Sequence, residues 1–152
     1  MKATIGALYS IRESMAEVLE TVMPPKDGRI LRKLHRAIAT EIEDVEPIRT
    51  KLMERYSKGM DEKGQHYILP KPGDDDFAEF NKEFYVELMG TVVDVPYEKI
   101  DVDALDDFFE RKDIDVKQKV VMQIEDFNRQ VDFEEQEAKK KKEEAEEEKK
   151  DE

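Results

Sequence analysis

Hydrophobic residues recur every three to four positions along much of this chain, which is the period of an amphipathic α-helix. The first stripe, over residues 3–22, consists of Leu8, Ile11, Met15, Val18 and Val22. The second, over residues 29–58, consists of Leu31, Leu34, Ile38, Ile42, Val45, Ile48, Leu52 and Tyr56. Pro24 and Pro25 separate the stripes, because proline lacks an amide donor and ends a helix. The pattern predicts an N-terminal antiparallel helical hairpin, with Asp27-Gly28 in its loop and a kink, not a break, at Pro47.

The period changes in the middle of the chain. Residues 66–69 and 91–97 are β-prone runs bounded by glycine and proline, and we expect them to pair as a small two-stranded β unit. Between them, Asp74-Asp75-Asp76 opens a third predicted helix over residues 75–89, with Gly90 at its C-terminal cap. The stripe of this helix is Phe77, Phe80, Phe84 and Leu88. The predicted fold class is mainly α with a minor β element (α+β).

Two C-terminal helices and a charged tail complete the prediction. Asp101 or Asp103 is expected to cap a short helix, and Asp115 to cap a last one. The last helix carries Val116, Val120, Val121, Ile124 and Phe127. Residues 134–152 then hold ten acids and six lysines, and such a segment can bury no apolar area. We therefore expect a single globular domain at 1–133 and, at 134–152, a solvated helical or disordered tail, with an acidic interaction tail as the alternative.

The charge and composition of the chain limit what it can bind. Lys and Arg total 26 and Asp and Glu total 39, so the formal net charge is −13. Phosphate repels such a chain, which disfavours direct nucleic-acid binding. The absence of Cys excludes disulfides, zinc fingers and thiol nucleophiles. No stretch approaches the ~20 apolar residues of a membrane span, and no signal peptide is evident. We expect no membrane contact and a cytoplasmic location.

No catalytic, cofactor-binding or metal-binding residue is predicted. Asp74-Asp75-Asp76 fits helix capping better than Mg²⁺ binding, and the acids at 101, 103, 106 and 107 miss the spacing of a calcium loop. His35 is expected to be solvated or ion-paired, and His66 has no carboxylate or serine at catalytic spacing. No glycine-rich phosphate loop occurs. The sequence therefore predicts a protein that is not an enzyme and carries no cofactor.

Five cations gather at the start of the second predicted helix, with Asp27 as the one acid among them. They are Lys26, Arg29, Arg32, Lys33 and Arg36. Two interpretations remain open. The cluster could contact an anion or an acidic partner, an interpretation that gains from the unfavourable interaction of cations with a helix N-terminus. Alternatively, Glu13, Glu17 and Glu20 of the first helix could pair with it across the hairpin. The hairpin geometry favours pairing.

Several short motifs follow one another over residues 1–127. A Glu-rich helix ends in Arg49, Lys51, Leu52, Glu54, Arg55 and Tyr56; then come Asp61-Glu62-Lys63-Gly64, Glu79-Phe80-Asn81-Lys82-Glu83 with Glu87-Leu88, Val93-Asp94-Val95, and Val102-Asp103-Ala104-Leu105. In this order the motifs resemble a family of small proteins of tailed phages and prophages, chiefly of Gram-positive bacteria. The resemblance implies a phage origin and brings no activity with it. The basic residues at 26–36 and the charged tail lie outside the resemblance.

Two hypotheses for function follow. In the first, the chain is a phage accessory protein that acts in the host bacterial cytoplasm by binding another protein. It would inhibit a host enzyme or defence complex, with its acidic surface occupying a nucleic-acid-binding cleft. In the second, it is a structural or assembly component of the phage particle, and a homo-oligomer is then open. An apolar stripe left over once the core is filled would favour the second hypothesis.

Overall fold

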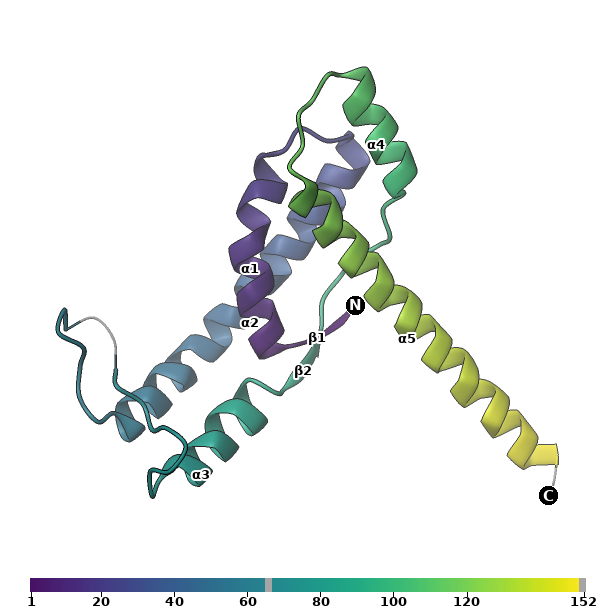
Figure 1. Cartoon of the computed structure of the whole chain (residues 1–152). Coiled ribbons are helices and arrows are strands. Elements are labelled where there is room, and N and C mark those ends of the chain that lie inside the picture. Colours follow the sequence, from purple (N-terminus) through teal and green to yellow (C-terminus); the bar gives the residue numbers. More distant parts are fainter. Residues whose placement is uncertain (65–66, 151–152) are drawn as a thin grey trace. The chain divides into compact units, whose positions relative to one another are not determined.

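The computed structural model describes residues 1–64 and 67–150, with side chains described up to residue 148 (Figure 1). In chain order the elements are β1 (Lys2–Thr4), α1 (Ile5–Glu20), α2 (Pro25–Tyr56), α3 (Phe77–Phe80), the π-helix η1 (Asn81–Leu88), β2 (Val92–Asp94), α4 (Val102–Arg111) and α5 (Gln118–Lys150). β1 and β2 form a two-stranded antiparallel sheet. The predicted fold class, mainly α with a minor β element, is confirmed.

The chain divides into two compact units, and each is described by itself. Unit 1 consists of Met1–Lys2, Ser14–His35 and Asp94–Glu152, and unit 2 of Ala3–Glu13 and Arg36–Val93. The helices α1 and α2 both run through the two units, so each unit holds a segment of each helix. Within unit 1 the short link between α1 and α2 closes the predicted antiparallel hairpin. The expectation of a single domain at 1–133 stays a prediction.

The helix α2 begins earlier than its hydrophobic stripe. Pro25 occupies its first position, where the fixed φ of proline suits a helix and no amide hydrogen is needed. The Gly28 N–H donates to the Pro24 carbonyl at 3.0 Å, and Asp27 lies in the first turn, where it complements the helix dipole. The prediction of a loop at Asp27-Gly28 is therefore wrong. The helix runs unbroken through Pro47.

Unit 2 is built around an aromatic core. Leu52 and Tyr56 of α2 pack with Phe80 of α3 and Phe84 of η1, and Phe80 is only 1% exposed. The Phe80 ring lies 5.4 Å from that of Tyr56 and 5.2 Å from that of Phe84. These phenylalanines are core residues, as their helical spacing indicated.

The strand at Val92–Asp94 pairs with a different partner from the one predicted. The Ile5 N–H donates to the Thr91 carbonyl at 2.9 Å, next to the pairing of β1 with β2. Residue Tyr67 instead forms an isolated antiparallel bridge with Met60. The predicted pairing of 66–69 with 91–97 is therefore wrong, because Tyr67 and Ile68 pair locally with residues 58–60. His66 lies outside the described residues.

Unit 1 buries one face of α5, through Val120, Ile124 and Phe127. Asp101 caps α4 as predicted, since its carboxylate accepts the Ala104 N–H at 3.1 Å. Asp115 does not cap the last helix, which begins at Gln118. The helix continues through the predicted tail, where every side chain from 135 to 148 is exposed.

Candidate functional site

The basic residues singled out in the sequence lie along one side of α2. A helix turns by about 100° per residue, which places all five within an arc of about 120°. All five are exposed. Leu31, Leu34 and Ile38 lie on the opposite side of the helix and are at most 1% exposed. Lys26, Arg29, Arg32 and Lys33 belong to unit 1 and are called the basic face below; Arg36 continues the same side of the helix in unit 2.

The expected pairing of these cations with α1 does not form. Among the described residues, no ion pair joins a side chain of the basic face to a carboxylate. Glu17 pairs instead with Lys117 at 3.2 Å, just before α5, and with Lys119 at 2.5 Å, in the first turn of α5. Hydrogen bonds from these two lysines hold the pKa of Glu17 below its ordinary value. The positive charge of the basic face therefore stays uncompensated by a direct ion pair.

The acid within the cluster does not neutralise it either. Asp27 is half-buried, at a helical position turned about 100° from Lys26 towards the core side of α2. Burial raises the pKa of Asp27, and the charge of Asp101 adds to this effect, while the neighbouring Lys26 lowers the pKa. Asp27 thus belongs to the interior edge of unit 1, and the cations face solvent without it.

A hollow of about 400 Å³ adjoins the basic face within unit 1. Lys26, Arg29 and Lys33 line one side of it, and the segment from Pro96 to Glu98 lines the other. Ile30, which is 9% exposed and lies between Arg29 and Arg32 in the sequence, also lines the hollow. The hollow therefore has three cations on one side and the Tyr97 ring with the Glu98 side chain on the other.

The aromatic wall of this hollow is Tyr97, and it is held in place from behind. Its hydroxyl donates to Asn128 Oδ1 at 2.8 Å, and its ring packs against Phe127 at 5.3 Å. Asn128 also accepts the Ile100 N–H at 3.1 Å and donates to the Ile100 carbonyl at 2.8 Å. Burial raises the pKa of Tyr97 well above its ordinary range. The hollow thus combines a fixed wall with long basic side chains.

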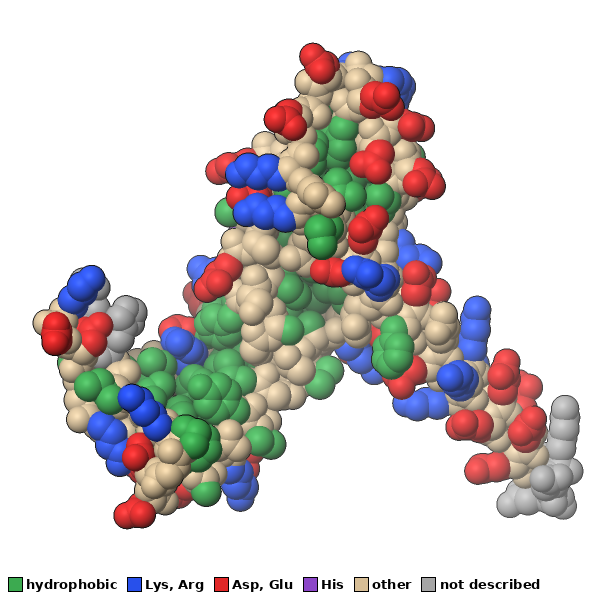
Figure 2. Space-filling view, viewed as in Figure 1, with side chains coloured by type: hydrophobic (Ala, Val, Ile, Leu, Met, Phe, Trp, Pro, Cys, Tyr) green, Lys and Arg blue, Asp and Glu red, His purple; other side chains and the backbone are tan. Residues whose placement is uncertain are grey.

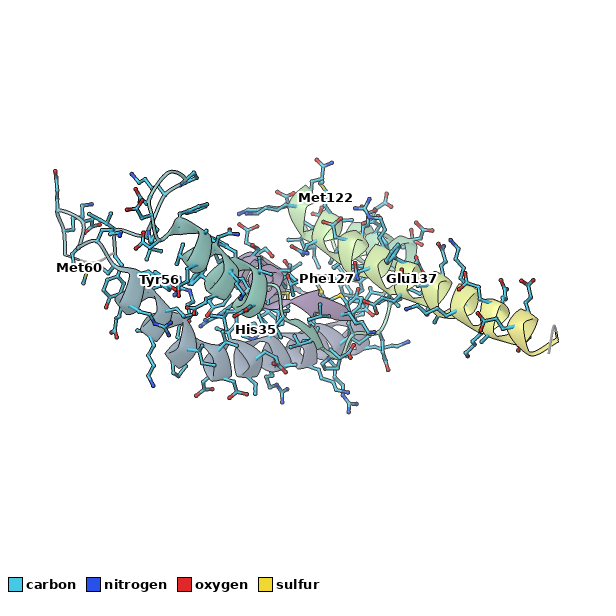
Figure 3. The ribbon with its side chains drawn as sticks, turned by 90° about the horizontal axis from the view of Figure 1, so that it is seen from below. His35, Tyr56, Met60, Met122, Phe127 and Glu137 are labelled. Atoms are coloured by element: carbon cyan, nitrogen blue, oxygen red, sulfur yellow. The ribbon has the colours of Figure 1, made fainter. Side chains whose placement is uncertain are left out.

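The sequence did not indicate this wall, because Tyr97 and Asn128 are separated by 31 residues and Tyr97 was expected only as the end of a strand. Other sequence candidates lie elsewhere. Asp76 occupies the N-cap position of α3 without a side-chain cap bond and pairs with Lys58 at 2.6 Å. His35 is half-buried (Figure 3). Within the described residues, no group of three His, Asp or Glu side chains could hold a metal ion.

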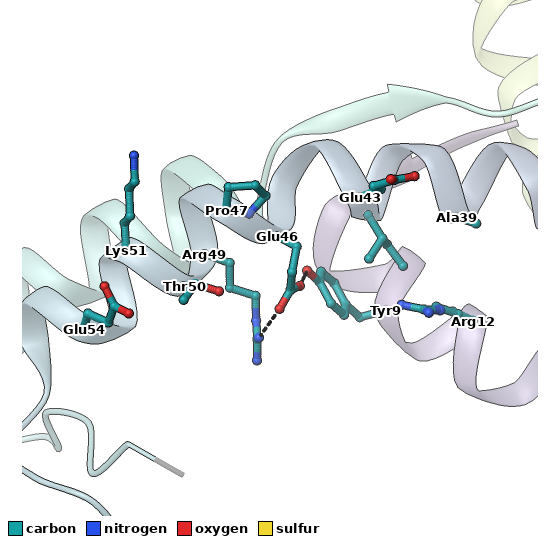
Figure 4. Close-up of a pocket in the computed structure, with 11 residues that line it drawn as sticks. Tyr9, Arg12, Ala39, Glu43, Glu46, Pro47, Arg49, Thr50, Lys51 and Glu54 are labelled. Atoms are coloured by element: carbon teal, nitrogen blue, oxygen red, sulfur yellow. Dashed lines mark hydrogen bonds and ion pairs between the residues drawn. The ribbon is translucent and has the colours of Figure 1, made fainter. Parts of the chain in front are cut away.

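A second hollow, of about 860 Å³, lies in unit 2 along α1 and α2 (Figure 4). The Tyr9 hydroxyl donates to Glu46 Oε2 at 2.5 Å, Arg49 pairs with Glu46 Oε1 at 3.2 Å, and the Arg49 guanidinium lies 5.3 Å from the Tyr9 ring centre. Burial and the Glu46 carboxylate raise the pKa of Tyr9 to about 12. These three side chains satisfy one another, and the whole lining holds three cations and three acids, so the hollow has no excess of one charge, unlike the basic face.

Unit 2 also carries exposed apolar side chains. Tyr85 and Val86 of η1 are 52% and 63% exposed, and Val92 of β2 is 60% exposed. Figure 2 shows hydrophobic side chains gathered on the surface of this unit. Large contiguous apolar patches are typical of surfaces that bind proteins.

Comparison with protein-family models, with curated proteins and with solved structures found no match. The resemblance to phage proteins therefore stays a prediction. Among the helices described, none is long and apolar enough to cross a membrane.

Proposed function

We propose that this protein works by binding another protein and that the basic face of α2 is the contact. The observation that carries the proposal is the uncompensated charge of Lys26, Arg29, Arg32 and Lys33 in a chain whose net charge is −13. An acidic patch on a partner is attracted to this face, whereas a basic patch is attracted to the acid-rich remainder of the surface. Such an arrangement fixes the orientation of a partner and speeds its encounter.

The setting of the proposed contact is a phage accessory protein inside a bacterial host. There it would bind a host enzyme or defence complex and inhibit it, with the acid-rich remainder of its surface occupying the place of a nucleic acid. The basic face would anchor the complex, because arginine is enriched among the residues that dominate binding energies. The proposal assigns no catalytic step and needs no cofactor.

The test compares two double variants as baits in a host lysate, with quantitative mass spectrometry of the captured proteins. The first is Arg29→Ala with Arg32→Ala. The control is Lys71→Ala with Lys112→Ala, two exposed lysines without an ion pair among the described residues. Both variants change the net charge equally. Truncating interface arginines weakens binding by roughly thirtyfold, or about 2 kcal/mol.

The expected result is a partner that the wild type and the control both capture and that the arginine variant loses, at an unchanged melting temperature. A partner retained by the arginine variant would exclude the basic face as the contact. A lowered melting temperature in that variant would show that the arginines support the fold instead.

The second candidate function, a component of the phage particle, is favoured by the exposed apolar side chains Tyr85, Val86 and Val92. They are residues that the core of unit 2 leaves uncovered, which is the feature expected of an assembling protein. Tyr85→Ser with Val86→Ser should convert an oligomer to a monomer in size-exclusion chromatography if this function is correct. An oligomer that survives this double substitution would exclude the patch as an assembly surface.

A further inference from the structure

The exposed end of α5 presents charge on every side. All side chains from 135 to 148 are exposed, and Glu137 is one of those that project into solvent (Figure 3). Within this stretch, residues 143–148 hold five glutamates and one alanine. This short run, called the acidic segment below, has no apolar side to bury against its own unit.

The acidic segment complements the basic face in sign and in size. Six helical residues rise by about 7.5 Å, and Arg29 and Lys33 are separated by about 6 Å along α2. The four cations of the basic face have no ion pair among the described residues, and the glutamates at 143–148 have none either. Within the part of the chain that the structure describes, one molecule therefore carries both a cationic face and a run of carboxylates that have no ion pair.

The two surfaces of a single molecule cannot meet while α5 stays helical. Phe127 of α5 packs on Tyr97 at 5.3 Å, and Tyr97 lines the hollow beside the basic face. Glu146 lies nineteen residues further along the same helix, which is a distance of about 28 Å at 1.5 Å per residue. An acidic segment that reaches a basic face must therefore belong to another molecule.

We propose that the acidic segment of one molecule docks on the basic face of a second copy. The inference rests on the proposed function, since it uses the same face and names an occupant for it. Because the two surfaces differ, the contact is heterologous and each molecule offers one surface of each kind. Repetition of the contact builds chains or closed rings. The attraction acts between exposed charges, so it weakens once the Debye length falls below about 10 Å.

The test uses sedimentation velocity of the full chain in about 20 mM and about 500 mM NaCl. The face variant is Arg29→Glu with Lys33→Glu, and the segment variant is Glu144→Lys with Glu147→Lys. The matched controls carry the same charge changes elsewhere, as Lys71→Glu with Lys112→Glu and as Glu135→Lys with Glu137→Lys. Circular dichroism of each variant checks that its helix content is retained.

The wild type and both controls should show a roughly twofold or larger rise in average mass with concentration at low salt, and lose it at high salt. The face variant and the segment variant should each be monomeric alone. An equimolar mixture of the two should associate again, because the unchanged face of the segment variant meets the unchanged segment of the face variant. One chain with all four substitutions should also associate, because both charges are reversed. This recovery separates the docking from a simple loss of fold.

A wild type that stays monomeric at low salt overturns the inference, and so does a segment variant that still associates. Failure of the inference is distinguishable from failure of the proposed function. If the wild type is monomeric while the face variant still loses a captured host protein, the proposed function stands and the occupant is wrong. If the chain self-associates through the basic face and no other protein depends on that face for capture, the partner is a second copy alone.

Discussion

Replacing Gly90 and Gly28 by alanine should change stability in opposite directions, although the chemical change is the same. Gly90 follows η1, where a Cβ atom would lie 2.3 Å from the Val86 carbonyl oxygen and 3.3 Å from that of Tyr85. Gly28 lies inside α2, and a Cβ there meets nothing within 4 Å. The first site has no room for the methyl group, and the second has a helical backbone that alanine prefers.

The magnitudes follow from these contacts. At Gly90 the separation must grow from 2.3 Å to the 3.4 Å of ordinary contact, and both neighbours are backbone atoms of η1. Overpacking of this kind costs about 1–3 kcal/mol, and the absence of a yielding side chain places Gly90→Ala at about 2–3 kcal/mol. At Gly28, alanine should stabilise by about 0.5–1 kcal/mol, because it loses less backbone entropy on folding.

Thermal unfolding followed by circular dichroism measures both effects. For a chain of this size, Gly90→Ala should lower the melting temperature by about 4–12 °C and Gly28→Ala should raise it by about 1–4 °C. A destabilised Gly28→Ala variant would refute the helical start of α2 and support the loop that the sequence suggested there. A Gly90→Ala variant as stable as the wild type would refute the close approach to Val86 at the end of η1.

Three further measurements test other parts of the structure. Glu46→Gln should lower the pKa of Tyr9 from about 12 towards its ordinary 10.0 in an ultraviolet titration. The raised pKa contributes stability that is present below pH 10 and is lost as the pH rises through 12, so the stability of the variant should fall less steeply than that of the wild type between pH 10 and pH 12. Deletion of residues 135–152 should change the melting temperature by less than about 2 °C, because the side chains described there are all exposed. A larger fall would show that this end of α5 packs against the rest of the chain. Glu17→Gln should lower the free energy of unfolding at neutral pH and match the wild type in acid. The depressed pKa of Glu17 contributes stability that is lost as the pH falls through that pKa. Equal stability of variant and wild type at both pH values would mean that Lys117 and Lys119 do not stabilise the fold.

The hydrophobic periodicity was sufficient to predict the helical elements but not the ends of them. The stripe of α2 starts at Leu31, whereas the helix starts at Pro25, because the first turn needs capping chemistry and not a buried face. Asp27-Gly28 is a common turn dipeptide, yet Pro25 just before it is a favoured first helical residue. The structure follows the second of these two local signals.

Two features of the middle of the chain could not be predicted from local patterns. The spacing of Phe77, Phe80 and Phe84 suits an α-helix, and the wider turn of η1 is visible only in the bond from the Met89 N–H to the Phe84 carbonyl at 2.9 Å. The pairing of β1 with β2 joins residues about 90 positions apart. Strand partners at such a separation are set by the packing of the helices between them.

The candidate site, too, could be predicted from the sequence only in part. The sequence located the five cations, but it predicted that they form ion pairs with Glu17 and its neighbours in α1. That prediction considers α1 and α2 alone. In unit 1 a third helix competes for the same carboxylate, and Lys117 and Lys119 reach Glu17 from 100 and 102 residues away. A single glutamate cannot neutralise both groups of cations. The basic face also lies on the side of α2 opposite the buried Leu31 and Leu34, and its cations have no ion pair among the described residues.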